Sequence, residues 1–347
     1  MRYQVNENVI KYCDGIFEVK DRKTGNEFLY KPLLKLDNSF NPKNFEIRFL
    51  YNTCDDVSEN SIFKLKADSI RIGWVFPVQS LESLEHDYVN NKFYLQYAYV
   101  VIFKLLQMIE FSNEEYSDLS ILDYYKDDTL QILVYDKENA KKIDGFDISN
   151  YSVDLFSKGY SYCRGGNVFT KPEKIDENIN VKQLPKPIRD ISYINVLFME
   201  LIPLQESSYS KFHMIYQIIE ILIGVVFNYE IQSLIQEISD SPNDLFEKRD
   251  KLHDITLEKE RVIRLFSNYC RIELQKKEIL NNLCEKLLQD NDRKSKENSV
   301  GNNLYAVRCL IVHNLYSLNK DSRELLKKIN NIFLDVVLDI LFTFREK

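Results

Sequence analysis

The 347-residue sequence contains few of the residues that build metal centres and disulfide frameworks. It has four histidines and six cysteines, and no two cysteines form a Cys-x-x-Cys pair. No group of cysteines and histidines has the spacing of zinc ligands, so we expect no metal site and no cofactor. Thiols without a disulfide pattern are typical of a reducing compartment, which predicts a cytoplasmic protein. The cysteines are Cys13, Cys54, Cys163, Cys270, Cys284 and Cys309.

No secretory leader is expected, because the first residues, MRYQVNEN, contain no apolar core. The most apolar window, Met214–Ile231, contains Gln217, Glu220 and Asn228. Polar groups in these places predict a buried helix of a soluble protein rather than a membrane span. No P-loop, Gly-x-Gly-x-x-Gly motif or nucleophile elbow is present, and the commonest nucleotide-binding and hydrolase motifs are therefore excluded.

The chain has nine glycines but 43 tyrosines and phenylalanines, which predicts well-filled cores. Its length predicts two domains. Residues 1–172 are expected to form a β-rich domain with one long helix at 91–111. A turn at Lys23–Gly25 indicates a hairpin between strands at 17–20 and 27–30. Further strands are predicted at 45–50, 70–76 and 131–135, with a second hairpin at 160–170, and the two segments at 45–50 and 70–76 alternate in period two.

The segment Lys171–Arg189 contains three prolines and little periodicity, which predicts a linker at residues 173–189. Residues 190–347 are expected to be entirely helical, so the fold class is α+β. Asp290–Gly301 is predicted to be a polar loop, and Ser241–Asp244 is typical of a helix start. The expected helices cover residues 208–238, 256–290, 302–318 and 321–345.

The net charge of −7 argues against broad, non-specific binding of nucleic acid. Residues 259–296 nevertheless carry ten Lys or Arg against six Asp or Glu, a local net charge of +4. Two interpretations stay open for this segment, a pair of solvated amphipathic helices or a surface that guides RNA. Asp335 and Asp339 are i,i+4 neighbours on the last helix, and without a third ligand they predict a solvated face rather than a metal site.

The segment Arg308-Cys-Leu-Ile-Val-His313-Asn314 carries the strongest chemical indication. Arginine can hold a phosphate in a bidentate grip, and histidine can move a proton near neutral pH. This segment resembles the Arg-x-x-Ile-Val-His motif of the HEPN superfamily, in its ApeA-like branch, with Cys309 where many members have a polar residue. The stretch from Phe212 to Leu222, with its embedded Glu220, resembles the family's first long helix. The resemblance covers about residues 205–347.

The resemblance implies a helical bundle that acts as a homodimeric, metal-independent endoribonuclease on an RNA substrate. It implies that His313 is the general acid or base and that Arg308 stabilises charge on the phosphoryl oxygens. Asn314 would orient His313 or hold the ribose. Glu220 is expected either to enter the site or to form a structural ion pair with Arg308. The products would be a 2′,3′-cyclic phosphate and a 5′-hydroxyl.

On a straight helix, Leu304, Val307, Ile311, Leu315 and Leu318 form one apolar stripe, Arg308 borders it, and His313 lies on the opposite side. Arg308 and His313 are about 140° apart, so one helix does not converge both side chains on one phosphate. Either the helix breaks near His313, or a second copy supplies the missing group. The small residues Ala306 and Cys309 beside His313 favour the second, a two-fold dimer.

Two other functions stay open beside the nuclease: a HEPN-like module that binds RNA or protein without cutting, and an antitoxin or partner-binding scaffold. His86, His213 and His253 are interpreted as structural. By its position beside a nuclease, the N-terminal domain is expected to sense an unknown trigger. The family resemblance implies a regulated toxin in antiviral defence, with no membrane partner.

Overall fold

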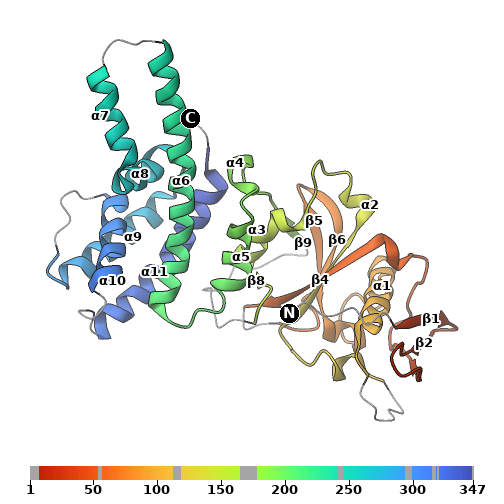
Figure 1. Ribbon diagram of the computed structural model, residues 1–347. Coiled ribbons are helices and arrows are strands. Elements are labelled where there is room, and N and C mark those ends of the chain that lie inside the picture. Colours follow the sequence, from red (N-terminus) through yellow and green to blue (C-terminus); the bar gives the residue numbers. More distant parts are fainter. Residues whose placement is uncertain are drawn as a thin grey trace. The chain divides into compact units, whose positions relative to one another are not determined.

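The computed structural model describes residues 8–53, 57–111, 119–164, 178–240, 245–293, 299–314, 318 and 320–345 (Figure 1). The chain divides into two compact units, Met1–Lys182 and Gln183–Lys347. The first unit is β-rich and the second is helical, so the fold is α+β. The division falls inside residues 173–189, which the sequence analysis predicts as the linker.

The first unit begins with a three-stranded antiparallel sheet of β1 (Val9–Cys13), β2 (Ile16–Lys20) and β3 (Glu27–Tyr30). The turn between β2 and β3 is closed by Asp21, whose carboxylate accepts hydrogen bonds from the Thr24 hydroxyl and the Lys23 backbone. Gly25 adopts a φ of +77°, which a side chain would disfavour. The predicted hairpin is therefore confirmed.

A second sheet of six strands forms the body of the first unit (Figure 1). All neighbouring strands are antiparallel except β5 and β9. Because β9 belongs to this sheet, part of the range predicted as linker is a strand. The second arm of the hairpin predicted at 160–170 lies outside the described residues. In sheet order the strands are β8 (Tyr160–Ser161), β4 (Phe45–Asn52), β7 (Leu130–Asp136), β6 (Ile70–Pro77), β5 (Phe63–Ala67) and β9 (Asn178–Val181).

The long helix α1 (Lys92–Met108) confirms the helix predicted at 91–111 and is slightly shorter. It begins where the Asn91 side chain accepts a hydrogen bond from the Tyr94 backbone. Tyr94 is fully buried and contributes to an aromatic core with Trp74 and Phe76. Short helical segments complete the unit: η1 (Pro42–Asn44), η2 (Val78–Glu82), η3 (Ile121–Asp123), α2 (Lys137–Ala140), η4 (Ile148–Tyr151) and α3 (Ser152–Ser157).

Strand β6 differs from its predicted alternation, because every residue from Ile72 to Pro77 is buried. The strand lies between β5 and β7, and both of its faces are covered. The register with β5 shifts between Leu65 and Lys66, next to Gly73. A Cβ at Gly73 would overlap the backbone carbonyl of Val134, so only glycine permits this close approach of β6 and β7.

The second unit contains the remaining helices, and those predicted at 208–238 and 321–345 are confirmed as α6 and α11. The helix predicted at 302–318 is confirmed as α10 as far as Asn314, and residues 315–317 lie outside the described residues. The helix start predicted at Ser241–Asp244 lies outside the described residues. The elements are α4 (Lys186–Arg189), α5 (Ser192–Val196), η5 (Leu197–Leu201), α6 (Ser208–Asp240), α7 (Leu245–Thr256), α8 (Glu258–Arg264), η6 (Leu265–Tyr269), α9 (Leu274–Gln289), α10 (Val300–Asn314) and α11 (Lys320–Thr343).

Helix α6 is long and apolar enough, by length and composition, to cross a membrane, and 33% of that apolar window is buried within the protein. Its first half carries the buried residues that pack in the bundle, among them Phe212, Tyr216 and Ile219. Phe212 and Tyr216 both lie against Phe333 of α11. Such packing is that of a core helix, although α6 is exposed along much of its second half.

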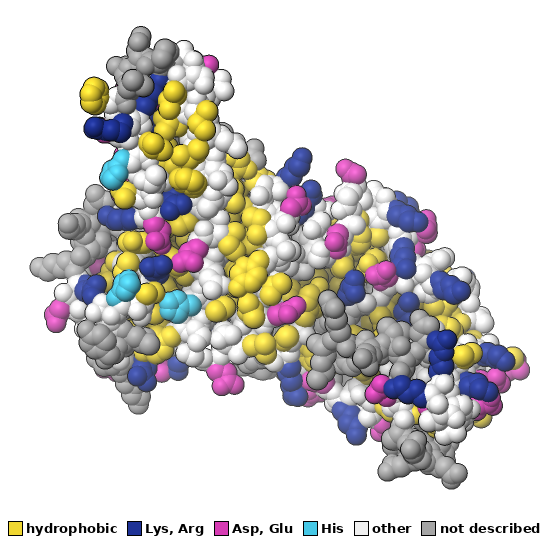
Figure 2. All heavy atoms as spheres, in the orientation of Figure 1, with side chains coloured by type: hydrophobic (Ala, Val, Ile, Leu, Met, Phe, Trp, Pro, Cys, Tyr) yellow, Lys and Arg dark blue, Asp and Glu magenta, His cyan; other side chains and the backbone are white. Residues whose placement is uncertain are grey.

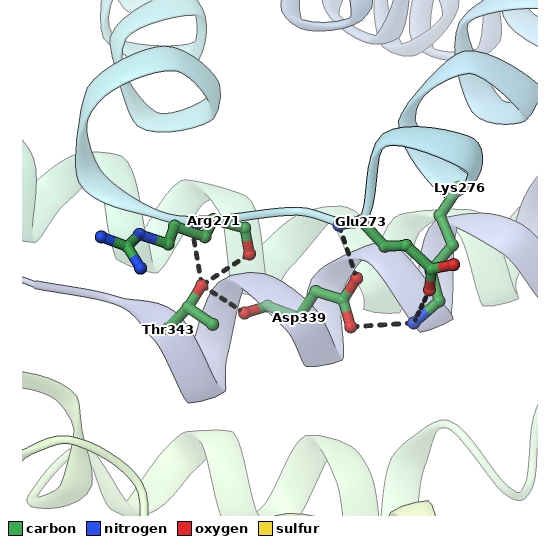
Figure 3. A network of polar contacts seen from close by, with 5 residues as sticks. All are labelled: Arg271, Glu273, Lys276, Asp339 and Thr343. Atoms are coloured by element: carbon green, nitrogen blue, oxygen red, sulfur yellow. Dashed lines mark hydrogen bonds and ion pairs between the residues drawn. The ribbon is translucent and has the colours of Figure 1, made fainter.

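The prediction of a single helix at 256–290 is wrong, because the chain leaves helical geometry after η6 and becomes helical again at Leu274. Cys270 is extended, with φ −145° and ψ 167°. The freed backbone groups find partners on α11 (Figure 3): the Arg271 N–H donates to the Thr343 hydroxyl (2.8 Å) and the Glu273 N–H donates to the Asp339 carboxylate (3.2 Å). Hydrogen bonds from α11 therefore replace those that a continuous helix would make.

Helix α11 buries the predicted stripe, which comprises Ile329, Phe333, Val336, Val337, Ile340, Leu341 and Phe344. The expectation that Asp335 and Asp339 form a solvated face is wrong for Asp339. Its carboxylate accepts a hydrogen bond from Lys276 at 2.9 Å, in addition to the one from Glu273 (Figure 3). Asp335 is partly buried, and burial raises its pKa, with Asp339 adding to the rise and Lys276 opposing it.

Replacing Gly73 with alanine is expected to lower the free energy of unfolding by about 3 kcal/mol, because the new Cβ overlaps the β7 backbone. The matched control is Gly224→Ala in α6, where a Cβ meets no atom within 4 Å. There the change should raise stability by about 0.5–1 kcal/mol, since alanine is the better helix former. Denaturant unfolding of both variants measures this, and equal effects would contradict the close-approach argument.

The two carboxylates of α11 should respond to amide substitution with opposite signs. Asp339→Asn should destabilise the protein by about 1 kcal/mol at pH 7, because Lys276 loses a charged partner. Asp335→Asn should stabilise it there, because the raised pKa of Asp335 means that the folded state disfavours the charged carboxylate.

The pH dependence of the Asp335 effect follows from the same shift. The pKa of Asp335 is higher in the folded than in the unfolded protein. The free energy of unfolding therefore falls as pH rises from about 3.8 through the folded pKa, and it stays lowered at higher pH. The gain from Asp335→Asn should therefore be present at pH 7 and vanish below the ordinary aspartate pKa. Thermal unfolding across this range measures it, and a gain independent of pH would contradict the assignment.

Candidate active site around Arg308

Helix α10 places the predicted site residues as its hydrophobic pattern requires. Leu304, Val307 and Ile311 are buried toward the bundle, as the predicted stripe has them. Arg308 borders this stripe and its side chain is 23% exposed. Leu318 is buried as well, whereas Leu315 lies outside the described residues.

Arg308 points toward α6 and α8 and lies between two carboxylates. Its Nη2 is 3.4 Å from Oε1 of Glu220 and 4.0 Å from Oε1 of Glu258. Its guanidinium carbon lies 5.9 Å from the ring centroid of Tyr216, at the limit of a cation–π contact. The predicted ion pair between Glu220 and Arg308 is therefore present, and Glu220 lies at the edge of the candidate site.

The electrostatics of this cluster follow from burial and from the two carboxylates. Burial alone would lower the pKa of Arg308, but the charges of Glu258 and Glu220 outweigh it and raise that pKa. Burial, followed by the charge of Glu258, strongly raises the pKa of Tyr216. Burial also raises the pKa of Tyr305, which lies beside Cys309. Arg308 is thus a permanent cation, and the two phenols beside it stay neutral.

His313 lies apart from this cluster, on the exposed face of α10. In the part of the chain that the structure describes, its ring has no hydrogen bond or ion pair. The helix continues to Asn314, which is half-buried, so no break before His313 turns the two side chains toward each other. Of the predicted residues, the structure brings Arg308 and Glu220 together and leaves His313 about 140° away around the helix.

Glu258 and Tyr216 were not predicted as parts of the site. Nothing in the sequence connects Glu258 with Arg308, because their proximity depends on how α8 packs against α10. Tyr216 lies four residues before Glu220 on α6, and this spacing places the two side chains on one face of the helix. That spacing is the only sequence signal that indicates the cluster.

The direction of α10 relative to α6 determines which end of α6 lies near His313. A Cβ on Gly301 would come within 3.0 Å of Ile263 on α8, and Arg264 of α8 pairs with Glu230 far along α6. Arg308 instead meets Tyr216 and Glu220, nearer the start of α6, so α10 and α6 are antiparallel. His313 therefore lies toward the end of α6 that carries His213. In the helical unit, the face drawn in Figure 2 carries histidine side chains close to Lys or Arg and Asp or Glu side chains.

Two cations of the basic segment at 259–296 have acidic partners among the described residues. Arg264 pairs with Glu230, and Lys276 pairs with both Glu273 and Asp339. These pairs place part of the segment's charge in contacts within the helical unit. Residues 294–298, which include two of its lysines, lie outside the described residues.

The chemistry available in one protomer is set by the balance of charge around Arg308. Two carboxylates against one guanidinium leave the immediate cluster with a net charge of −1, and a bound phosphate would compete with them. Among the described residues, no group of three or more His, Cys, Asp or Glu side chains is placed to hold a metal ion.

Comparison with known proteins adds no assignment to this geometry. No protein-family model matches the chain, and neither the curated proteins nor the solved structures give a match. The HEPN resemblance and the roles that it implies for Arg308, His313, Asn314 and Glu220 therefore stay predictions.

Proposed function

We propose that this protein is a metal-independent endoribonuclease of the HEPN type that acts as a homodimer. The observation that carries the proposal is the placement of Arg308 on α10. Its guanidinium is fixed beside Glu220, partly exposed, and followed within the same helix by an exposed histidine, His313. A fixed cation and an exposed imidazole, once two protomers bring them to one phosphate, are the minimum equipment for phosphodiester transesterification.

In this proposal, the 2′-hydroxyl of RNA attacks the adjacent phosphorus and the bond from phosphorus to the 5′ oxygen breaks. A base takes the proton of the 2′-hydroxyl, an acid gives one to the leaving 5′ oxygen, and His313 supplies one of these roles. Arg308 stabilises the charge on the phosphoryl oxygens. Asn314, the last residue of α10, orients His313 or holds the ribose. DNA has no 2′-hydroxyl and is therefore not a substrate.

The homodimer is supported by the charge and the geometry of a single protomer. Arg308 is offset by Glu220 and Glu258, so binding a phosphate needs further positive charge. A two-fold contact between exposed faces of α10 would bring a second Arg308 and a second His313 to the same cleft. Val312, next to His313, is 42% exposed, and an apolar side chain there suits a helix–helix contact.

The setting that we propose is cytoplasmic antiviral defence, with the nuclease acting as a regulated toxin. The N-terminal unit would respond to the trigger. The second candidate function is a HEPN-like module that binds RNA or protein without cutting, and the two carboxylates at Arg308 favour it, because they occupy the guanidinium that a phosphate would need.

The nuclease is tested by incubating labelled RNA and DNA with the purified protein in EDTA. Wild type should cut RNA only and leave 2′,3′-cyclic phosphate ends. His313→Ala and Arg308→Ala should each lower the rate by at least about 100-fold, the usual contribution of a general acid–base group or of a charge stabiliser. His253→Ala, which removes another exposed histidine, on α7, is the matched control and should keep the full rate.

Cleavage that survives both active-site substitutions would reject this mechanism. RNA binding without cleavage by wild type, unchanged in Arg308→Ala, would support the second candidate instead. Circular dichroism and size-exclusion chromatography of each variant show whether fold and oligomeric state are kept, so that a lost activity is not confused with a lost fold.

The shared site makes a separate prediction about mixed dimers. If Arg308 of one protomer acts with His313 of the other, then Arg308→Ala and His313→Ala protein should complement each other after the protomers exchange. The mixture should regain a substantial part of wild-type activity, because each heterodimer holds one intact Arg308–His313 pair. The rate after co-expression with two different tags and tandem purification measures this, and a heterodimer no faster than its parents would contradict a site shared between protomers.

A further inference from the structure

A cavity in the first unit, remote in sequence from Arg308, is lined mainly by cations and apolar groups. It has a volume of about 320 Å³ and lies between the last turns of α1 and the start of β4. This volume is at the small end of the range for ligand pockets. The lining residues are Phe45, Glu46, Ile47, Lys104, Gln107, Met108 and Lys137.

Positive charge exceeds negative charge around this cavity. Glu46 is its one acidic lining residue and is already engaged: its carboxylate lies 3.4 Å from Lys137 and 3.6 Å from Arg48, and it accepts a hydrogen bond from the Tyr135 hydroxyl at 3.1 Å. Lys104 has no hydrogen bond or ion pair within the described part of the chain. The lining therefore carries two lysines against one carboxylate, a net charge of +1, and that carboxylate is shared with Arg48 outside the lining.

Lys104 lies in surroundings that disfavour its positive charge. Burial, and then the charge of Lys137, lower the pKa of Lys104, and Glu46 only partly opposes them. A partly buried ammonium without a partner costs free energy that a bound anion would offset. Glu46 is shared between Lys137 and Arg48 and only partly offsets the repulsion of Lys104 by Lys137, so further negative charge between the two lysines would lower it.

The C-terminal end of α1 would ordinarily repel an anion, because its last carbonyls carry partial negative charge. Here Asn8 donates hydrogen bonds to several of these carbonyls. Its side-chain amide donates to the carbonyls of Leu106 and Ile109, both at 2.9 Å, and its backbone N–H donates to that of Gln107 at 3.2 Å. This capping lowers the negative potential at the mouth of the cavity.

We propose that this cavity binds the phosphate group of a small phosphorylated ligand through Lys104 and Lys137. Lysine binds phosphate as a point charge that reaches several oxygens, and two lysines match the charge of a phosphomonoester. Gln107 can donate a further hydrogen bond, and Ile47 and Met108, which are partly exposed, offer apolar surface to the rest of the ligand. All of these residues lie in the first unit, so this site stands independently of the ribonuclease proposal.

The test is calorimetric titration of the full-length protein, without RNA, with adenosine 5′-monophosphate and with inorganic phosphate. Vesicles containing phosphatidylglycerol, beside vesicles of phosphatidylcholine, test whether the phosphate belongs to a lipid headgroup. Lys104→Met and Lys137→Met should each weaken binding at least tenfold. Lys35→Gln, which removes an exposed lysine of the same unit, is the control and should bind as wild type does.

A stability readout keeps the test decisive if one variant binds nothing. Without ligand, Lys104→Met should melt at a higher temperature than wild type, because it removes a cation that burial disfavours. Added phosphate ligand should raise the melting temperature of wild type and not that of Lys104→Met.

Binding of adenosine monophosphate or inorganic phosphate that depends on both lysines supports a free ligand. Binding confined to phosphatidylglycerol vesicles, with the same dependence, supports a headgroup as its source. The proposal is overturned if no probe binds wild type, or if Lys104→Met and Lys137→Met bind as wild type does.

Discussion

The helical unit depends on the break between Tyr269 and Leu274, where the chain leaves one helix direction and takes another. Backbone N–H groups exposed by the break would be costly if left unpaired. Asp339 and Thr343 of α11 supply the acceptors, so the last turns of α11 stabilise a bend that lies about 70 residues earlier in the sequence. The bend allows α8 and α9 to pack separately against α10, and it thereby brings the first turn of α8, with Glu258, to Arg308.

The charge balance at Arg308 is the second constraint, and it gives the site two opposed properties. Glu220 and Glu258 hold the guanidinium in place, which spares the entropy of ordering a long side chain when a ligand arrives. The same carboxylates compete with any anionic ligand. A guanidinium held in this way is well oriented but already partnered, so its affinity for phosphate in one protomer is low until further positive charge is added.

Much of the architecture could be predicted from sequence periodicity. The hairpin around Gly25, helix α1, helix α6 and the buried stripe of α11 follow from turn residues and apolar spacing within each segment. The break after Tyr269 could not, because its hydrogen-bond acceptors are distant in sequence. The burial of both faces of β6 also depends on which strands lie beside it. At the site, the angle between Arg308 and His313 followed from helix geometry, whereas the proximity of Glu258 required the packing of three helices.

Two buried cysteines, one at the break and one in α9, can report local opening of the helical unit. Cys270 begins the extended segment and is buried, and burial raises its pKa to about 12, while Cys284 lies fully buried in α9. Neither thiol is exposed to an alkylating reagent in the native state, and neither is ionised near neutral pH. The rate at which each becomes labelled therefore measures a different event. Cys270 reports separation of the bend from α11, and Cys284 reports opening of the bundle, so the two rates distinguish a loosening of the bend from unfolding of the whole unit.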